Sequence, residues 1–329
     1  MDPARFSGAK VLIIGGAGFI GSNLAIRLVG LGASVVLIDS MNPQYGGNLH
    51  NIATIRDQVR LNISDVRDKY SLQWLVQGVD WIFNLAGQTS HMDSMLDPFT
   101  DLEINCAAQL SLLEVCRAHN PAAKLVFAST RQIYGRPQYL PVDENHPIKP
   151  VDVNGINKTA GEFYHLLYND VHGIRTTVLR LTNTYGPRMR IKDARQTFLG
   201  VWIRNILTGQ PVEVWGGAQL RDFNYVDDVV EAMLVAALDP GCDGKAYNVG
   251  GDEVLSLAEV ARIVCAAKGS TAGYVVREYP ADRKKIDIGD YYSDYGLFER
   301  GTGWRPRVPF AEGVARTVAY FADSLERYL

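Results

Sequence analysis

The chain has 329 residues, of which 47% are hydrophobic and 21% charged, a composition typical of a globular protein with apolar material for one large α/β unit or two modest domains. The formal net charge of −3 excludes a general attraction to nucleic acid or to an anionic membrane, so we expect neither as a partner. No stretch reaches the ~18 uninterrupted apolar residues that a membrane span requires. The four cysteines are widely spaced and form no C-x-x-C pair, which favours a cytoplasmic protein over a disulfide framework.

Short β-rich apolar runs alternate with longer segments of helical period along the first half of the chain. The predicted strands read KVLIIGG, SVVLID, DWIFNLAG, AKLVFAST and IRTTVLRL. The clearest predicted helices are FIGSNLAIRLVGLG, residues 98–118 and residues 158–172. Such alternation is typical of a parallel sheet covered by helices on both faces. The sequence therefore predicts an α/β fold with a Rossmann-type, doubly wound parallel sheet.

The alternation breaks after about residue 181. A polar loop, NTYGPRMRIKDARQ, precedes a predicted helix near residues 198–208 and the predicted strand PVEVW. The segments YVDDVVEAMLVAAL and KAYNVGG then read as one more helix and strand of the main sheet. We therefore predict a sheet domain formed by residues 1–181, to which residues 222–250 return. Residues 182–221 and 251–329 are predicted to form a smaller lobe, with a cleft between the two parts.

The segment GGAGFIG joins the first predicted strand to the first predicted helix, with glycines at Gly15, Gly18 and Gly21. In this context the glycines permit a tight turn, close approach of a pyrophosphate and close helix–sheet packing, and the helix N-terminus favours negative charge. The second strand ends in Asp39, 18 residues past Gly21, where a carboxylate can accept both ribose hydroxyls and would repel a 2′-phosphate. We therefore expect NAD rather than NADP. The candidate binding residues of the loop are Gly15, Gly18, Phe19, Ile20 and Gly21.

A set of further motifs extends the pattern almost to the C-terminus. They read SDVRD, NLAGQTS, STRQIYG, LRLTNTYGPR, RDFNYVDDVVEAM, YNVGG and GWRPRVPFAEGV. Together with the glycine loop, their order and spacing resemble the extended short-chain dehydrogenase/reductases, and more narrowly the nucleotide-sugar epimerase/dehydratase family. The resemblance implies that the sheet domain binds NAD and that the smaller lobe binds a nucleotide-diphosphate sugar. It also implies a homodimer formed by the helices that contain residues 102–117 and 158–168.

The resemblance also implies roles for individual residues. On the cofactor side, Asp65 and Val66 would hold the adenine, and Leu85, Ala86 and Gly87, followed by Gln88, would line the floor under the nicotinamide ribose. Asn105 would stabilise the central sheet near the cofactor, and Lys158 would bind the ribose hydroxyls. On the substrate side, Thr130 would bind the reacting sugar hydroxyl beside Arg131, Asn183 would lie near the phosphates, and Arg221 and Arg283 would grip the diphosphate.

The family's catalytic Tyr-x-x-x-Lys signature is incomplete in this chain. Its register reads Asn154-Gly155-Ile156-Asn157-Lys158, and none of the 16 tyrosines has a lysine four residues later. Asparagine cannot act as a base, although it is a good helix N-cap. Another group would then have to move the proton, and the candidates are His91, Thr130 and Lys158. The catalytic candidates are thus Thr130, Lys158, Asn154 and His91.

Three explanations of the missing tyrosine stay open: another group replaces it, the chemistry needs no such base, or the protein binds its ligands without turnover. Thr130-Arg131-Gln132 lacks the two acids of the family's 4,6-dehydratases, which favours an epimerase that oxidises a sugar carbon and returns the hydride. The alternatives are a dehydratase or net oxidoreductase, and a non-catalytic binding protein. The histidines show no ligand spacing, so no metal is implied, and His165 and His172 are expected to form a surface or interface pair.

Overall fold

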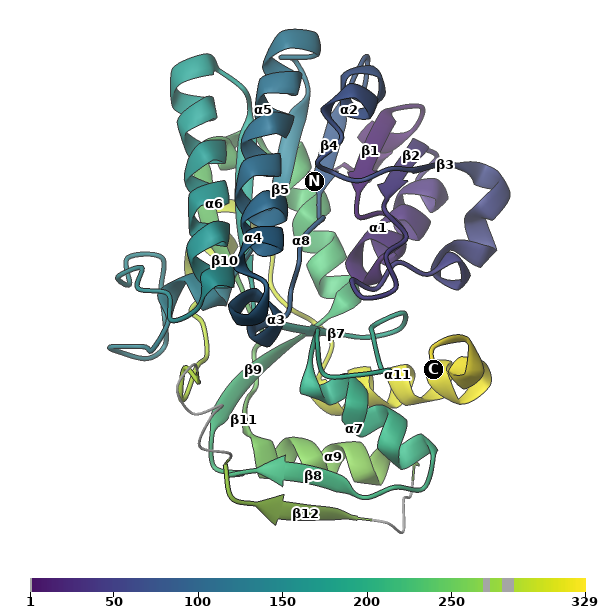
Figure 1. The fold of residues 1–329 in the computed structure, drawn as a ribbon, viewed down its shortest axis with the longest axis vertical. Coiled ribbons are helices and arrows are strands. Elements are labelled where there is room, and N and C mark those ends of the chain that lie inside the picture. The colour runs from purple at the N-terminus through teal and green to yellow at the C-terminus, as the bar shows by residue number, and fades with distance from the viewer. Residues whose placement is uncertain (1, 269–272, 280–286) are drawn as a thin grey trace.

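The protein is described by a computed structural model over residues 2–268, 273–279 and 287–329 (Figure 1). Its centre is a seven-stranded sheet in the order β10-β6-β5-β4-β1-β2-β3, in which all neighbouring strands are parallel. The strands are β1 (Lys10–Ile14), β2 (Ser34–Asp39), β3 (Val59–Ile63), β4 (Trp81–Asn84), β5 (Lys124–Thr130), β6 (Thr176–Leu181) and β10 (Lys245–Val249). The predicted doubly wound sheet is confirmed, and KAYNVGG does supply its last strand.

Helices cover both faces of this sheet, because successive side chains of a buried strand point to opposite sides. On β1, Val11 and Ile13 pack into the cluster that contains residues of α1 (Phe19–Gly30) and α8 (Val226–Leu238). Leu12 and Ile14 pack into a second cluster with residues of α2 (Lys69–Leu75), α5 (Ala108–His119) and α6 (Val153–His172). Figure 1 shows α5 and α6 side by side on one face, with α8 behind the sheet.

The helix predicted over residues 98–118 is three consecutive elements. α4 (Pro98–Leu102) is followed by a single π-helical segment (Glu103–Ala107) and then by α5. Asn105 lies on the π-helical segment, where its side chain is fully buried. Such π-helical turns inside helices are frequent at functional sites. A short helix, α3 (His91–Leu96), lies between β4 and α4.

Most of the remaining elements gather below the sheet (Figure 1), whereas Phe298, in the helix Gly296–Thr302, packs on Tyr247 of β10. The remaining elements are α7 (Phe198–Leu207), α9 (Leu257–Lys268), α10 (Gly296–Thr302) and α11 (Phe310–Ser324), with β7 (Asn183–Tyr185), β8 (Val212–Trp215), β9 (Leu220–Tyr225), β11 (Val254–Ser256) and β12 (Tyr274–Arg277). Strands β11, β9 and β7 form one small sheet, and β12 and β8 pair in another. Short 3-10 segments (Pro3–Phe6, Leu49–Gln58, Arg131–Tyr134, Pro240–Cys242 and Leu325–Arg327) complete the described chain.

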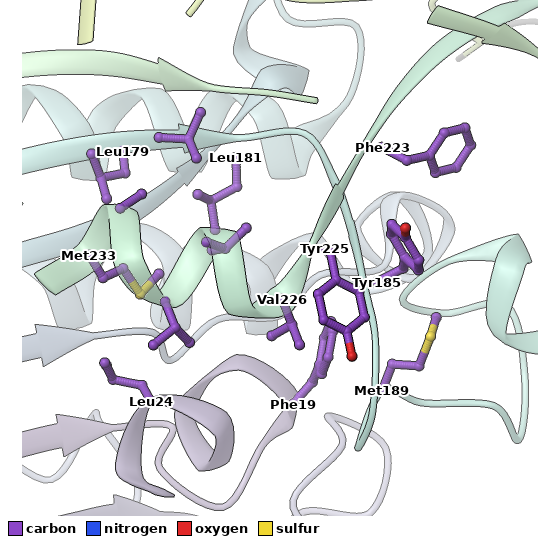
Figure 2. Close-up of a cluster of buried hydrophobic side chains, with 14 of the residues drawn as sticks. Phe19, Leu24, Leu179, Leu181, Tyr185, Met189, Phe223, Tyr225, Val226 and Met233 are labelled. Carbon is purple, nitrogen blue, oxygen red and sulfur yellow. The ribbon is translucent and has the colours of Figure 1, made fainter. Parts of the chain in front are cut away.

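One continuous hydrophobic cluster joins the two parts. Figure 2 shows Phe19 and Val226, from helices of the main sheet, beside Tyr185, Met189 and Tyr225 from the segments that lead into the lower part. The same cluster extends to buried residues of α7, α9 and α11. Because these elements share a core, the cleft between them has walls fixed by packing.

Two further findings concern the cysteines and the length of the helices. All four cysteines are free thiols. Within the described ranges, no helix is both long enough and apolar enough to span a membrane.

Candidate active site

A first cavity opens at the carboxyl ends of β1 and β4, where the strand order of the sheet reverses. In open α/β sheets, ligands bind at this switch point. Gly15 adopts a positive φ of 81°, and a Cβ there would lie 3.0 Å from the backbone N of Ala86. A Cβ on Gly21 would lie 2.1 Å from the carbonyl oxygen of Gly15. The glycine loop therefore packs so closely against its surroundings that only hydrogen fits at these two positions.

The N-terminus of α1 faces this cavity without a side-chain cap. Gly18 is the N-cap residue, and no side chain accepts a hydrogen bond from the first turn there. Gly18, Phe19, Ile20 and Gly21 all line the cavity. Uncapped N–H groups and the helix dipole together provide a binding site for an anion such as a pyrophosphate.

Asp39 lies at the end of β2 and lines the same cavity. Its Oδ2 accepts from the backbone N–H of Ala17 at 2.9 Å and its Oδ1 from that of Met41 at 2.9 Å. Burial raises the pKa of the Asp39 carboxyl above its usual range, although these backbone hydrogen bonds lower it. The carboxyl group is thus held in one orientation toward the cavity, and each oxygen keeps a lone pair for a ribose hydroxyl.

The adenine-side residues lie further along this rim. Asp65 and Val66 both line the cavity. The Asp65 carboxylate is held by Arg67 through two hydrogen bonds of 2.9 Å, and the hydrogen bond from Arg67 lowers the pKa of Asp65. Arg67 also donates to Glu103 at 2.7 Å. The side chain of Asp65 is therefore fixed by a surface ion pair.

The segment after β4 forms the cavity floor. Leu85, Ala86, Gly87 and Gln88 all line the cavity. A Cβ on Gly87 would lie 3.0 Å from both Asn105 Oδ1 and Lys158 Nζ. The carbonyl oxygen of Gln88 accepts from Asn105 Nδ2 at 2.9 Å. Asn105 thus links the floor segment to the π-helical segment by a hydrogen bond. Because Gly87 has no side chain, Lys158 Nζ is not covered by a Cβ at this position.

Lys158 is buried on the first turns of α6, and its Nζ donates to the carbonyl oxygen of Ala128 at 3.1 Å. Burial lowers the pKa of Lys158 to about 8, although the carboxylate of Asp101 raises it. An ammonium group has three donors. Those not directed at Ala128 are available to the hydroxyls of a ribose in the cavity.

Asn154 does not cap α6, although its residue type suits that role. Asp152 is the N-cap residue, and its Oδ1 accepts from the backbone N–H of Gly155 at 2.7 Å. Asn154 lies inside the helix, where its Nδ2 donates to the carbonyl oxygen of Gln88 at 2.7 Å and to Asp101 Oδ2 at 3.1 Å. Both asparagine N–H bonds are therefore used by the protein, and Oδ1 is the polar atom left for a ligand.

Two of the histidines predicted to share a surface or interface occupy different environments. His165 is fully buried and stacks on Phe127, with ring centroids 4.3 Å apart. Its Nδ1 lies 2.8 Å from the carbonyl oxygen of Gly161. Burial lowers the pKa of His165 to about 4. His172 is exposed at the end of α6, so the predicted pair does not exist.

His91 is the first residue of α3 and lines the first cavity. Its Nδ1 lies 3.0 Å from Asp152 Oδ2. Thr130, at the end of β5, also lines this cavity, and its Oγ1 accepts from the backbone N–H of Gln132 at 3.2 Å. Asn154 and Lys158 line it as well, so the four predicted catalytic candidates all meet in one place.

A second cavity continues from the first into the lower part of the molecule. The two share five lining residues: His91, Arg131, Asn183, Gln196 and Thr197. Beyond these the second cavity is lined by aromatic side chains, among them Phe198, Trp202 and Trp215, and by Arg221. The shared residues join the two cavities into one cleft, which runs between the main sheet and the smaller elements.

Two arginines line this second cavity, the buried Arg221 and the partly buried Arg131. Arg131 Nη2 donates to Asn183 Oδ1 at 3.1 Å. Arg221 Nη1 donates to the carbonyl oxygen of Leu220 at 2.8 Å, and its Nη2 lies 3.6 Å from Asp287 Oδ1. Burial, and after it the charge of Arg131, lower the pKa of Arg221 to about 10. Two guanidinium groups that line one cavity favour an anionic ligand. The predicted Arg283 lies outside the described residues.

Two site residues were missed by the sequence analysis. Asp101 is fully buried on α4 and accepts from Asn157 Nδ2 at 2.8 Å as well as from Asn154. Asp152 contacts His91 and also accepts from Gln132 Nε2 at 2.7 Å. These contacts join segments that are about 20 to 60 residues apart, so no local spacing indicates them.

The fold and the glycine-loop cavity are those of a dinucleotide-binding α/β protein, and arginines line the cavity that adjoins it. Residues 11–250 match the NAD dependent epimerase/dehydratase family, and the chain belongs to this family. It is 30% identical over 316 residues to a UDP-glucose 4-epimerase of Mycolicibacterium smegmatis, covering 95% of this chain and 99% of that one. It is 31% identical over 319 residues to a dTDP-glucose 4,6-dehydratase of Streptomyces griseus. That match covers 94% of this chain and 93% of the dehydratase.

Solved structures of two UDP-glucose 4-epimerases are also similar to this chain. A UDP-glucose 4-epimerase of Thermus thermophilus in complex with NAD is 30% identical, with a TM-score of 0.85 over 96% of this chain and 99% of that one. A UDP-glucose 4-epimerase of Thermotoga maritima with UDP-glucose is 27% identical, with a TM-score of 0.88. The match covers 96% of this chain and 99% of that one. NAD is accordingly the cofactor of this protein. The close-packed glycine loop, the uncapped N-terminus of α1 and Asp39 fit that cofactor.

Proposed function

We propose that the protein is an NAD-dependent nucleotide-diphosphate-sugar epimerase, which oxidises one sugar carbon to a ketone and returns the hydride to its other face. The observation that carries this proposal is the continuous cleft, in which the cavity over Lys158 and Thr130 opens into a second cavity faced by Arg131 and Arg221. The first part has the shape and donors for a dinucleotide and the second has the charge for a diphosphate. The reacting sugar would lie where the two meet.

We assign the residues of the cleft as follows. The glycine loop with Phe19 and Ile20 would hold the pyrophosphate, Asp39 one ribose, Asp65 and Val66 the adenine, and Lys158 the nicotinamide ribose over the floor from Leu85 to Gln88. Thr130 and the Oδ1 atom of Asn154 would orient the sugar hydroxyl. Arg131, Asn183 and Arg221 would hold the diphosphate. When bound, NAD accepts the hydride and gives it back.

An epimerase is favoured over a 4,6-dehydratase by the side chains beside Thr130. Loss of water from a sugar needs an acid at the leaving hydroxyl. In this chain Arg131 is directed at Asn183, and the Gln132 amide is hydrogen-bonded to Asp152. Neither side chain can deliver a proton there. A dehydratase would therefore need its acids from another segment.

Asn154 favours a second candidate function, a protein that binds NAD and a nucleotide sugar without turnover.

Two experiments test these functions. Purified protein should first be denatured and the released ligand identified by its absorbance and mass. If no nicotinamide dinucleotide is released and added NAD does not bind, both functions are excluded. Wild type and Lys158→Ala should then be incubated with UDP-glucose and dTDP-glucose. Epimerised sugar from wild type but not from the variant supports the enzyme. Accumulating absorbance of reduced cofactor would instead indicate net oxidation.

We also propose a homodimer. The outer face of α6 exposes Ile156, Phe163, Leu167 and Val171 at spacings of seven, four and four residues. This apolar stripe is a suitable helix-packing surface. Phe163→Glu should lower the mass measured by light scattering from dimer to monomer. Trp74→Glu, at an exposed aromatic residue of α2, is the control that should leave the dimer intact.

A further inference from the structure

The side chain of His91 is held at one nitrogen and open at the other end. Its Nδ1 atom is buried and lies 3.0 Å from Asp152 Oδ2, at ion-pair distance but without the angle of a hydrogen bond, whereas the side chain as a whole is 39% exposed. The residue lines both cavities of the cleft. With Nδ1 buried, the exposed surface belongs to the rest of the side chain, which includes Nε2, and this side chain lies where the two cavities meet.

Asp152 is fixed from three sides. It is buried at the N-terminus of α6, where its Oδ1 accepts from Gly155 N–H at 2.7 Å. Its Oδ2 accepts from Gln132 Nε2 at 2.7 Å and contacts His91. Burial raises the pKa of the Asp152 carboxyl, but His91 and the two donors outweigh burial and hold that pKa below its usual range. The group is thus a carboxylate with little freedom to rotate.

Such a carboxylate selects one tautomer of the imidazole. An ionised carboxylate only accepts hydrogen bonds, so a carboxylate 3.0 Å from Nδ1 favours the Nδ1–H form of a neutral His91, with the lone pair on Nε2. The other charged groups around the ring are directed elsewhere. Asp93, on the same helix, pairs with Arg195 at 2.9 Å, and Arg131 is directed at Asn183. Lys158 Nζ donates to Ala128.

We propose that His91 is the proton acceptor and donor in place of the missing tyrosine, and that Asp152 is the residue that positions it. This inference rests on the proposed function. In the oxidation, Nε2 takes the proton of the sugar hydroxyl while the hydride of the same carbon leaves to NAD, and the carbon–oxygen bond becomes a ketone. In the return step, the hydride adds to the other face and the imidazolium returns the proton to the oxygen.

The neighbouring candidates serve this role less well. Both N–H bonds of Asn154 are donated to Gln88 and Asp101, and an amide oxygen takes up no proton near neutral pH. Thr130 has a hydroxyl group that needs a base of its own. Asn154 and Thr130 can orient the sugar hydroxyl toward Nε2. Lys158 Nζ donates to the carbonyl oxygen of Ala128, and its other N–H groups are assigned to the nicotinamide ribose.

Three variants test the proposed roles of His91 and Asp152. Asp152→Asn keeps the Oδ1 acceptor that caps α6 and removes the charge, and Asp152→Ser keeps a capping side chain without a carboxylate. His91→Asn removes the imidazole. The control is Asp97→Asn, because Asp97 caps α4 through Thr100 N–H in the same way and does not line either cavity. Bound NAD and the melting temperature are measured for each variant to establish that it folds.

Two readouts are combined. The first is the ¹⁵N spectrum of histidine-labelled protein, in which the signal lost in His91→Asn identifies His91. We expect the Nδ1–H tautomer in wild type and a mixture of tautomers in Asp152→Asn. The second is epimerisation of UDP-glucose. We expect kcat to fall at least about tenfold in Asp152→Asn and about 10²- to 10⁴-fold in His91→Asn, with KM nearly unchanged.

The outcomes separate the two proposals. Wild-type turnover together with unchanged kcat in His91→Asn, or in both Asp152 variants, would overturn the proton-transfer role and leave the epimerase standing. An Nε2–H tautomer in wild type would overturn the positioning role of Asp152 whatever the activity. No turnover of UDP-glucose or dTDP-glucose by NAD-loaded wild type would overturn the epimerase itself, and with it any proton transfer.

Discussion

Asn154 Nδ2 lies 3.1 Å from Asp101 Oδ2, and the two side chains meet in the buried space between α6 and α4. The same nitrogen donates to the carbonyl oxygen of Gln88. This arrangement fixes the amide so that its oxygen is the free polar atom. Asn154 is thus a group that can orient a hydroxyl, and it forms a buried link between two helices and the cavity floor.

The first prediction concerns Asp101. Asp101→Ala removes the acceptor of Asn154 and Asn157 and leaves two buried amide donors unsatisfied. We expect the free energy of unfolding in urea to fall by about 2–4 kcal/mol. Asp57→Ala, at an exposed aspartate, should change it by no more than about 0.5 kcal/mol. Equal effects of the two substitutions would show that the buried carboxylate does not stabilise the helices.

The second prediction concerns acid stability and His165. Its pKa of about 4 in the folded protein lies below the ordinary value of 6.5, because the ring is buried. The unfolded chain binds the extra proton between these values, so the contribution of His165 to stability is present above pH 6.5 and is lost as the pH falls toward 4. The loss amounts to about 3 kcal/mol.

Urea unfolding at a series of pH values between 7 and 4 measures this loss. The unfolding free energy of His165→Phe should fall less than that of wild type across the interval. His119→Gln, at an exposed histidine, should follow the wild-type curve. If the His165→Phe and wild-type curves run parallel, His165 is not responsible for the acid sensitivity.

The third prediction uses two glycines of α1. Gly21→Ala would place a methyl group 2.1 Å from the carbonyl oxygen of Gly15, so the loop must shift. We expect a destabilisation of about 1–3 kcal/mol and NAD binding that is much weaker than that of wild type. At Gly30 nothing lies within 4 Å of an added Cβ, and Gly30→Ala should stabilise the helix by up to ~1 kcal/mol. Full NAD content in Gly21→Ala would contradict the assignment of the loop.

The fourth prediction tests the diphosphate site. Arg221→Lys keeps the charge and loses the planar fork that holds two phosphate oxygens. Calorimetric titration with UDP should show an affinity about 10- to 100-fold weaker than that of wild type, with unchanged NAD content. Arg56→Lys, at an exposed arginine on the segment Leu49–Gln58, is the control and should bind UDP as wild type does. Unchanged affinity in Arg221→Lys would remove Arg221 from the proposed site.

The sequence predicts those parts of the site that are local in the chain. The glycine loop and Asp39 belong to one strand–helix–strand unit, and the periodicity of the flanking segments is sufficient to place them. The start of α6 could not be predicted in the same way. Asp152 and Asn154 are both good caps, and the choice between them is made by Asp101, Gln88 and His91, which come from other segments.

The most direct test of the proposed function is the product formed from UDP-glucose by the NAD-loaded protein, analysed by chromatography and mass spectrometry while the reduced-cofactor band is followed. We expect a nucleotide sugar of unchanged mass and inverted configuration at one carbon, with no accumulating reduced cofactor. A product lighter by one water, or stoichiometric reduced cofactor with an oxidised sugar, would contradict the epimerase.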